Sequence, residues 1–278
     1  MVLLVLFAAR TGLVSHIIPT GKQVCGVVSL KNHVYVVRRG VCDVEVYDAK
    51  TFKFQRYITV PGRGEMTYGI AACSEHNCLY VPDRSNIQVH RIELTKGKAV
   101  TKWPVTSQPC GLSVTTAHNV LVTCGTTKST LQEYTTHGEL VRTILLDPDI
   151  REPWHAVQMS DNRYVVSHQR ALHRVSVVSE DGAVVRSFGG PAGSEAAPLN
   201  GPRGVTLDGR GNVVVADCRN HRLLLLNKDF SEDRECLLNK ELSYPFSLWF
   251  DQKRNRLYVG EYGGGRVLVI ENFTLPDP

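Results

Sequence analysis

The stretch NGPRGVTLDGRGNVVVADCRNHRLLLLNKDF, residues 200–230, decides the fold of this chain. Its pattern predicts three short strands, at 204–208, 213–217 and 221–227, with a glycine-rich turn at 209–212. A polar fourth strand is expected at 231–238. The runs VVVA and LLLL are continuously apolar, which is typical of strands that are buried on both faces between stacked sheets. The stretch therefore predicts one four-stranded unit.

The sequence shows a regular repeat when its units are aligned on Gly204, which lies near the start of the first strand. The equivalent positions are Gly26, Gly69, Gly111, His155 and Ser247, at successive spacings of 43, 42, 44, 49 and 43 residues. The one long interval contains GGPAGSEAAP at 189–198, an insertion of small residues and prolines between units. A period near 43 residues with four strands per unit predicts an all-β, six-bladed β-propeller rather than a helical repeat array.

These six units fill the chain as one domain. The expected blades are 21–64, 65–106, 107–150, 151–198, 199–241 and 242–278. The last unit has only three strands before the sequence stops, so the ring lacks one outer strand. We predict that residues 12–19 supply it, because a strand from the opposite end closes the ring and removes exposed sheet edges.

Composition narrows the class of protein. A chain with 42% hydrophobic and 21% charged residues forms a folded core rather than a disordered segment. The apolar run Val2 to Ala9 is too short to span a bilayer, so we expect no membrane association. A net charge of +5 is only mildly basic, and we expect no readout of DNA sequence. We expect the domain to be monomeric.

Two stretches carry a specific resemblance. GPRGVTLDGRGNVVVADCRNHRLLLL and YGIAACSEHNCLYVPDRSNIQVHRI resemble NHL repeats, a family named for an Asn-His-Leu step. That step lies close to Asn220, His221 and Arg222 in the first stretch, three residues after an aspartate. In the second stretch the equivalent step is NIQ at 86–88. The other blades are assigned by spacing and strand pattern alone.

The resemblance implies a non-catalytic recognition scaffold, similar to the C-terminal NHL domain of tripartite-motif proteins. Such propellers bind protein or single-stranded RNA on one face, so both kinds of partner remain open. The chain would then be the substrate- or RNA-binding part of a tripartite-motif-like ubiquitin ligase. Any ligase activity would need a RING domain, which these 278 residues do not contain.

In a propeller, the loops before the first strand and after the second strand emerge on the same face, the top face, around the central channel. Basic and aromatic residues interleave at these positions, a combination that suits phosphate contacts and base stacking or an apolar protein interface. The candidate binding residues are Arg38, Arg39, Tyr68, Arg84, Lys128, Trp154, Arg170, Arg203, Arg219, Phe246 and Tyr262. Some of these arginines are equally expected to bridge blades through carboxylates.

An alternative is a metal centre in the channel. Acidic and imidazole side chains fall at equivalent blade positions and could bind Ca²⁺ or Zn²⁺. They are Asp83, His155, His168, Asp217 and Glu261. This would make the protein a lyase or lactonase-like hydrolase of the propeller type. Against it, an aspartate in a D-x-x-N step usually caps a loop through backbone hydrogen bonds, and our main prediction includes no cofactor.

The number and placement of the cysteines indicate the cellular compartment of the protein. Eight cysteines occur without a CxxC pair, which removes the common zinc motifs. Several lie in apolar strands, where free cysteine packs as a small hydrophobe. Cys73 and Cys78 could pair across a hairpin. The irregular placement favours a reducing, cytoplasmic location, while an extracellular location stays open.

Overall fold

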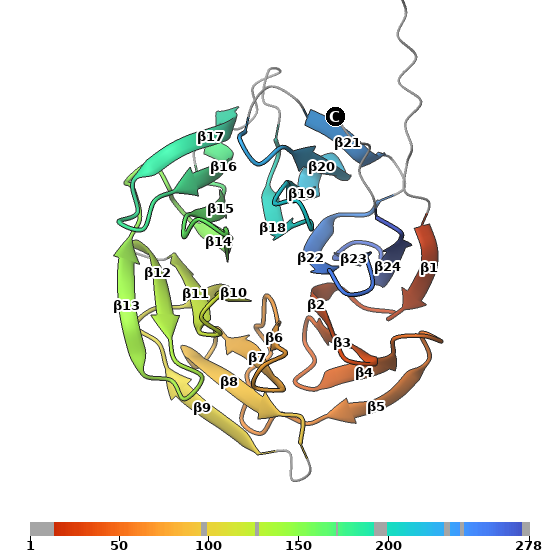
Figure 1. Ribbon diagram of the computed structural model, residues 1–278. Helices are drawn as coiled ribbons and strands as arrows, with labels where there is room; N and C mark the ends of the chain where they lie inside the picture. The colour runs from red at the N-terminus through yellow and green to blue at the C-terminus, as the bar shows by residue number, and fades with distance from the viewer. Residues whose placement is uncertain are drawn as a thin grey trace, which may run out of the picture.

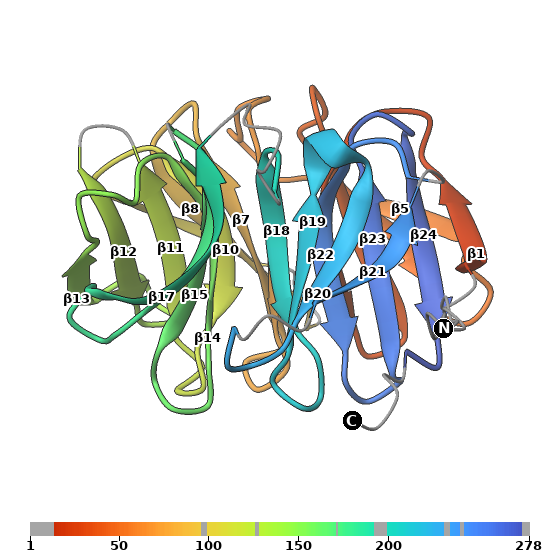
Figure 2. The ribbon, with the colours of Figure 1, turned by 90° about the horizontal axis from the view of Figure 1, so that it is seen from above.

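A computed structural model describes residues 14–95, 99–125, 128–170, 172–191, 199–230, 234–239 and 242–273. Six four-stranded antiparallel sheets are arranged as blades around a central axis, which confirms the predicted six-bladed β-propeller (Figure 1). Seen edge-on, the strands cross the thickness of the ring (Figure 2). The apolar run at the N-terminus and most of the predicted insertion, 192–198, lie outside the described residues.

The first three blades each run outward from the axis in chain order. Blade 1 comprises β2 (Val24–Leu30), β3 (His33–Arg38), β4 (Val44–Asp48) and β5 (Phe54–Ile58). Blade 2 comprises β6 (Ala71–Cys73), β7 (Cys78–Asp83), β8 (Gln88–Glu93) and β9 (Val100–Pro104). Blade 3 comprises β10 (Pro109–Val114), β11 (Val120–Gly125), β12 (Ser129–Tyr134) and β13 (Leu140–Leu145).

The last three blades include the one that joins the ends of the chain. Blade 4 comprises β14 (Pro153–Gln158), β15 (Tyr164–His168), β16 (Leu172–Val178) and β17 (Val184–Pro191). Blade 5 comprises β18 (Pro202–Leu207), β19 (Val213–Asp217), β20 (Arg222–Leu226) and β21 (Arg234–Asn239), with a short 3-10 helix η1 (Cys218–Asn220). Blade 6 comprises β22 (Pro245–Asp251), β23 (Arg256–Glu261), β24 (Arg266–Glu271) and β1 (Val14–Pro19).

Closure of the ring follows the prediction. Strand β1 pairs antiparallel with β24, with Ile17 opposite Leu268 and Pro19 opposite Arg266, so the N-terminal strand is the outer strand of the last blade. The hydroxyl of Thr20 also donates to the carbonyl of Gly265 at 2.7 Å. The N-terminal strand and the C-terminal strands are thereby held by one sheet, which completes the sixth blade (Figure 1).

The core lies between the faces of neighbouring blades. Val44 and Val46 of blade 1 belong to one buried cluster with Leu79 and Val81 of blade 2, all without measurable exposure. Comparable clusters join the other blades in turn. A single sheet exposes two apolar faces, so each blade is stable only against its neighbours. In the described part of the chain, no helix is long and apolar enough to cross a membrane.

Local contacts set where two of the third strands begin. The third strand of blade 1 starts at Val44, because Arg63 binds the carbonyl oxygens of residues 41–43. The third strand of blade 5 starts at Arg222, since His221 has a positive φ of 54° and belongs to the turn. Ile87, the equivalent residue of blade 2, has a φ of 53° and ends the preceding turn in the same way.

Candidate top-face binding site

One backbone contact fixes the rim of the top face in most blades. A residue one or two positions after the second strand donates its N–H to a carbonyl of the loop before the first strand, over 2.9–3.3 Å. This bond joins the two loops that the sequence places on the same face, so their side chains emerge together. The five residues held in this way are Arg39, Arg84, Arg170, Arg219 and Tyr262.

Bulges in the first strands aim a second set of side chains at the channel. The pairing of the first and second strands shifts register between Pro153 and His155, between Pro202 and Val205, and between Pro245 and Ser247. A bulge turns the extra residue away from the regular alternation of the strand. The residues inside these three shifts include the predicted site residues Trp154, Arg203 and Phe246.

The aromatic candidates form one cluster at the channel mouth. The ring centroids of Tyr68 and Trp154 lie 5.5 Å apart, and those of Trp154 and Phe246 lie 5.9 Å apart. Phe246 also stacks on Tyr262 at 5.2 Å and contacts Tyr68 at 6.0 Å. These separations are those of favourable aromatic pairs. The structure thus brings together four side chains from blades 2, 4 and 6, which we call the aromatic cluster.

Arg203 inserts its guanidinium into this cluster. Its Cζ atom lies 3.6 Å from the centroid of the Trp154 ring and 5.3 Å from that of Phe246. Nε and Nη1 are buried without a hydrogen-bond partner in the described residues. Burial lowers the pKa of Arg203 to about 10, and the nearby Cys218 thiol offsets part of this effect. Cation–π contact with Trp154 is therefore its main compensation for leaving water.

Below the cluster, the channel is narrow. The cavity there has a volume of about 80 Å³ and is lined by the first strands, including Cys25, Gly69, Gly111, His155 and Gly204. A space of this size holds a few water molecules, whereas pockets for small organic ligands measure about 300–1,000 Å³. The part of this face that a larger molecule could reach is therefore the channel mouth rather than the channel itself.

Two of the other cationic candidates contact the aromatic cluster directly. Arg39 bonds the Tyr262 hydroxyl, and Arg84 lies 5.8 Å from the Tyr68 ring while donating to the Cys110 sulfur at 3.5 Å. Arg170 is exposed and 3.7 Å from the Glu152 carboxylate. The other two exposed cations are Lys128 and Arg219.

Arg38 occupies a different place from the other arginines. Its side chain pairs with the buried Glu45 and donates to the carbonyl of Thr20 at 2.8 Å. Tyr47 also donates to Glu45, at 2.9 Å. Arg38 therefore bridges the second and third strands of blade 1 to the closing segment of the chain, and its guanidinium is occupied within the fold.

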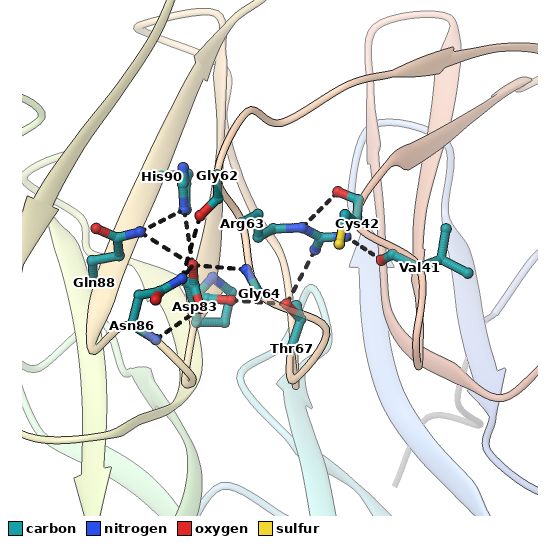
Figure 3. A network of polar contacts seen from close by, with 11 residues as sticks. Val41, Cys42, Gly62, Arg63, Gly64, Thr67, Asp83, Asn86, Gln88 and His90 are labelled. Atoms are coloured by element: carbon teal, nitrogen blue, oxygen red, sulfur yellow. Dashed lines mark hydrogen bonds and ion pairs between the residues drawn. The ribbon is translucent and has the colours of Figure 1, made fainter.

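The carboxylates of the metal alternative are bound by the protein itself. Burial alone would raise the pKa of Asp83, but donors from Asn86, Gly64 and Gln88 lower it to about 2 (Figure 3). Asp83 also accepts from the imidazole of His90, 3.2 Å away. Its two oxygens have enough donors to remain ionised without a cation.

Asp217 and Glu261 repeat this arrangement in blades 5 and 6. Asp217 accepts from the N–H of Asn200 at 2.7 Å and from the side chains of Asn220 and Arg222, each at 2.7 Å. Glu261 accepts from the N–H of Ser243 at 2.7 Å and from Arg266 at 2.5 Å. Each carboxylate thus ties the turn after the second strand to the loop before the first strand.

The two histidines of the alternative are also committed to the fold. His155 lies between blades 3 and 5, with Nε2 3.0 Å from the carbonyl of Leu112 and Nδ1 3.0 Å from the carbonyl of Val205. Burial lowers the pKa of His155, and its hydrogen bonds to these two carbonyls offset part of the effect. His168 is 1% exposed and bonds Ser176 through Nε2 at 2.9 Å. In the described residues, no group of three or more His, Cys, Asp and Glu side chains could hold a metal ion.

Sequence reasoning missed Arg63, which is 5% exposed. Its guanidinium donates to carbonyls of the blade 1 loop 41–43 and to the Thr67 hydroxyl at 3.1 Å (Figure 3). Arg63 directly precedes Gly64, whose N–H binds the carboxylate of blade 2. In blades 5 and 6 the residue at this position is a buried leucine, Leu199 or Leu242. An internal alignment of the blades on their carboxylates would have shown a cation at this apolar position.

The fold and this face define a six-bladed β-propeller with at least one NHL repeat. Residues 199–224, in blade 5, match the family model described as the NHL repeat. The chain is similar to the Protein brain tumor of Drosophila melanogaster, with 28% identity over 74 residues. That match covers 27% of this chain and 7% of the relative, so the chain spans only a small part of its length.

Solved structures with the same architecture differ widely in their names. Virginiamycin B lyase from Staphylococcus aureus is 14% identical, with a TM-score of 0.67, over 92% of this chain and 83% of that chain. Hydrazine synthase of Kuenenia stuttgartiensis has the same identity and TM-score over 92% and 96%. A nidogen/laminin complex is 18% identical, with a TM-score of 0.67, over 82% and 85%. At these identities the likeness is one of fold alone.

Proposed function

We propose that this propeller is a non-catalytic recognition scaffold that binds an acidic protein segment on its top face. The observation that carries the proposal is the aromatic cluster with Arg203 stacked on Trp154 at 3.6 Å. Buried aromatic and arginine side chains surrounded by polar residues are typical of the energetic centre of protein interfaces. Here the surroundings are cationic, with Arg39, Lys128 and Arg219 exposed.

Protein is favoured over single-stranded RNA as the partner. RNA bases need free ring faces to stack on. In this cluster one face of Trp154 is covered by Arg203, and Phe246 is only 8% exposed and stacked on Tyr262. The groups that remain available on the rim are mostly cations. Such a rim steers acidic side chains toward the channel mouth.

A catalytic role has less support. The buried carboxylates are saturated by hydrogen bonds, and the cavity of about 80 Å³ beside the aromatic cluster is too small for an organic substrate. The proposed role within a larger protein is that of the partner-binding part of a tripartite-motif-like ubiquitin ligase, acting in the cytoplasm. The NHL match in blade 5 supports this proposal at the level of the repeat.

Selection of a randomised peptide display library on the purified propeller tests the proposal, with a randomised single-stranded RNA pool in parallel at two salt concentrations. We expect enrichment of acidic peptides. In the double variant Arg39→Ala/Arg84→Ala their affinity should fall about ten-fold, since single charges at the rim of an interface contribute modestly one by one. The matched control Lys31→Ala/Lys253→Ala removes two exposed cations from turns between first and second strands, at the other face.

Three results would contradict the proposal. Equal loss of binding in both double variants would show charge attraction without a defined face. Enrichment of RNA with a steep dependence on salt, and no enrichment of peptides, would establish the RNA alternative. Stoichiometric Ca²⁺ or Zn²⁺ in protein purified without chelator would redirect the search to an enzyme.

A further inference from the structure

Two cysteines of blade 2 face each other directly. Cys73 ends β6, Cys78 begins β7, and the two are register partners in the antiparallel pair. Both are free thiols and are fully buried in the interface between blades 2 and 3. Directly opposed residues of an antiparallel pair have Cα atoms about 4.5–5.5 Å apart, which is within the range that a disulfide spans.

A histidine lies against one of these thiols. Nδ1 of His76, in the turn between the strands, is 3.3 Å from the Cys73 sulfur. Hydrogen bonds from Cys78 and from His76 lower the pKa of the Cys73 thiol, and the same contact raises the pKa of Cys78. The reactive form of cysteine is the thiolate, and a neighbouring imidazole favours it. The pair therefore consists of one activated thiol and one protonated thiol beside it.

We propose that Cys73 and Cys78 form an oxidation site that closes as a disulfide when the protein meets hydrogen peroxide. The Cys73 thiolate attacks one peroxide oxygen, the O–O bond breaks, and protonation releases water and leaves a sulfenic acid on Cys73. The Cys78 sulfur then attacks the Cys73 sulfur, the S–O bond breaks, and the departing hydroxide takes the Cys78 proton as a second water. Two thiols and one peroxide thus give one disulfide and two waters.

The turn between the cysteines is the route by which peroxide enters. Ser74, Glu75 and His76 are exposed, and His76 lies over the buried Cys73 sulfur. The ring of His118 contacts His76 edge-on at 6.2 Å, so two exposed imidazoles cover this end of the hairpin. Opening of a short exposed turn costs less free energy than opening of the core, and peroxide is small enough to enter through it.

Among the other cysteines whose side chains the structure describes, none has this combination. Cys110 lies inside a register shift of β10, and its neighbour across the sheet, Cys124, is opposite Pro109. Neither has a histidine within hydrogen-bond distance in the described residues, and burial raises the pKa of both thiols. Cys42 is only half-buried but has no other described cysteine as a register partner.

The disulfide would reinforce a short strand. β6 has three residues, whereas the first strands of the other blades have six or seven. The next residue on the same face of β7, Tyr80, bonds Thr136 of blade 3 at 2.6 Å. Oxidation would thus join β6, the shortest of the inner strands, to β7 beside their turn and close to a contact between blades, and would constrain the unfolded chain.

Peptide mapping of the whole chain tests the proposal. The protein is treated with hydrogen peroxide, denatured, and alkylated with N-ethylmaleimide. We expect the peptide that contains both cysteines to lose two hydrogens and resist alkylation until dithiothreitol is added. Cys42 should gain oxygen without forming a disulfide within the chain. The oxidised protein should melt several degrees higher than the reduced protein.

Two variants assign the roles. In Cys78→Ser the sulfenic acid on Cys73 should persist and be trapped by dimedone. In His76→Gln the disulfide should form about ten-fold more slowly, because the thiolate is less populated. The proposal is overturned if wild-type Cys73 and Cys78 stay fully alkylatable while Cys42 is oxidised, or if the first disulfide joins Cys110 to Cys124. Wild-type mapping decides this even if a variant fails to fold.

Discussion

The guanidinium of Arg203 lies over the indole of Trp154, with 3.6 Å between Cζ and the ring centroid, although the two come from different blades. The contact combines two opposing effects. A desolvated cation–π contact contributes about 2 kcal/mol. Each buried N–H group without a partner costs about 1–3 kcal/mol, and Arg203 has two such nitrogens, Nε and Nη1. Because the cost of two unpaired nitrogens equals or exceeds the gain from the cation–π contact, we predict that Arg203 serves binding rather than stability.

Substitution of Arg203 separates the two effects. Arg203→Met keeps the length and apolar character of the side chain, so we expect an unchanged or slightly raised Tm together with loss of peptide binding. Arg203→Lys keeps the charge but cannot stack as a planar group, and should lower stability by about 2 kcal/mol. Thermal denaturation and a binding assay on both variants test whether the methionine variant is the more stable of the two and has lost peptide binding. A lower Tm for the methionine variant than for the lysine variant would show that the charge itself stabilises the fold.

His168 predicts a specific dependence of stability on pH. Burial, with nearby Arg174 and His173, lowers its pKa from 6.5 to about 4. Between these values the unfolded chain binds a proton that the folded chain does not. The free energy of unfolding therefore falls as the pH drops from 6.5 to 4, by about 3 kcal/mol from this group.

The variant His168→Gln removes this titration and retains a donor for Ser176. We expect the difference in unfolding free energy between wild type and variant to change by about 3 kcal/mol between pH 7 and pH 4. Urea denaturation at several pH values measures it. The other buried histidines, including His155, titrate equally in both proteins, so a constant difference would exclude His168 as the source.

The left-handed residue of the blade 2 turn predicts a gain in stability. Ile87 has a φ of 53° and is 40% exposed, while blade 6 has Gly265 with a φ of 59° in the same place. A left-handed conformation costs a residue with a β-carbon about 1–2 kcal/mol, and less for asparagine. Ile87→Asn should raise stability by about 1 kcal/mol, whereas Ile87→Val should not. Chemical denaturation of the two variants distinguishes relief of strain from a general effect of removing an exposed apolar side chain.

These turns also show what the sequence can predict. The period and the carboxylates at Asp83 and Asp217 are visible because a repeat places the same residue types at the same spacing. The partners of those carboxylates are partly visible too, since the side chains at 88 and 222 both donate to them. The fold and its register were therefore predictable from local patterns.

Contacts between blades were not predictable in this way. Arg203 and Trp154 are 49 residues apart in sequence, and the choice of ring that the arginine covers depends on the angle between blades. Arg38 and Arg39 are neighbours, yet the first pairs with a buried glutamate and the second reaches the Tyr262 hydroxyl. Strand alternation and a bulge decide which side chain faces the channel, and composition does not encode either.

The glycine that marks the register in blade 3 predicts the sharpest loss of stability. A β-carbon on Gly111 would lie 2.4 Å from the carbonyl oxygen of Trp154 and 3.0 Å from the Cα of His155. Both are backbone atoms of the next blade, so the inner strands of blades 3 and 4 would have to separate. Such overpacking costs about 1–3 kcal/mol, and moving Trp154 would also disturb the aromatic cluster.

Gly111→Ala should therefore lower the Tm by several degrees and weaken peptide binding together. The matched control is Gly209→Ala, because a β-carbon there meets no atom within 4 Å and the backbone needs no left-handed conformation. The control should be neutral or stabilised by a few tenths of a kcal/mol through the unfolded state. Equal effects of the two substitutions would mean that the register glycines are kept for chain flexibility. Unequal effects would show that they are kept because the inner strands of neighbouring blades approach within contact distance of the backbone.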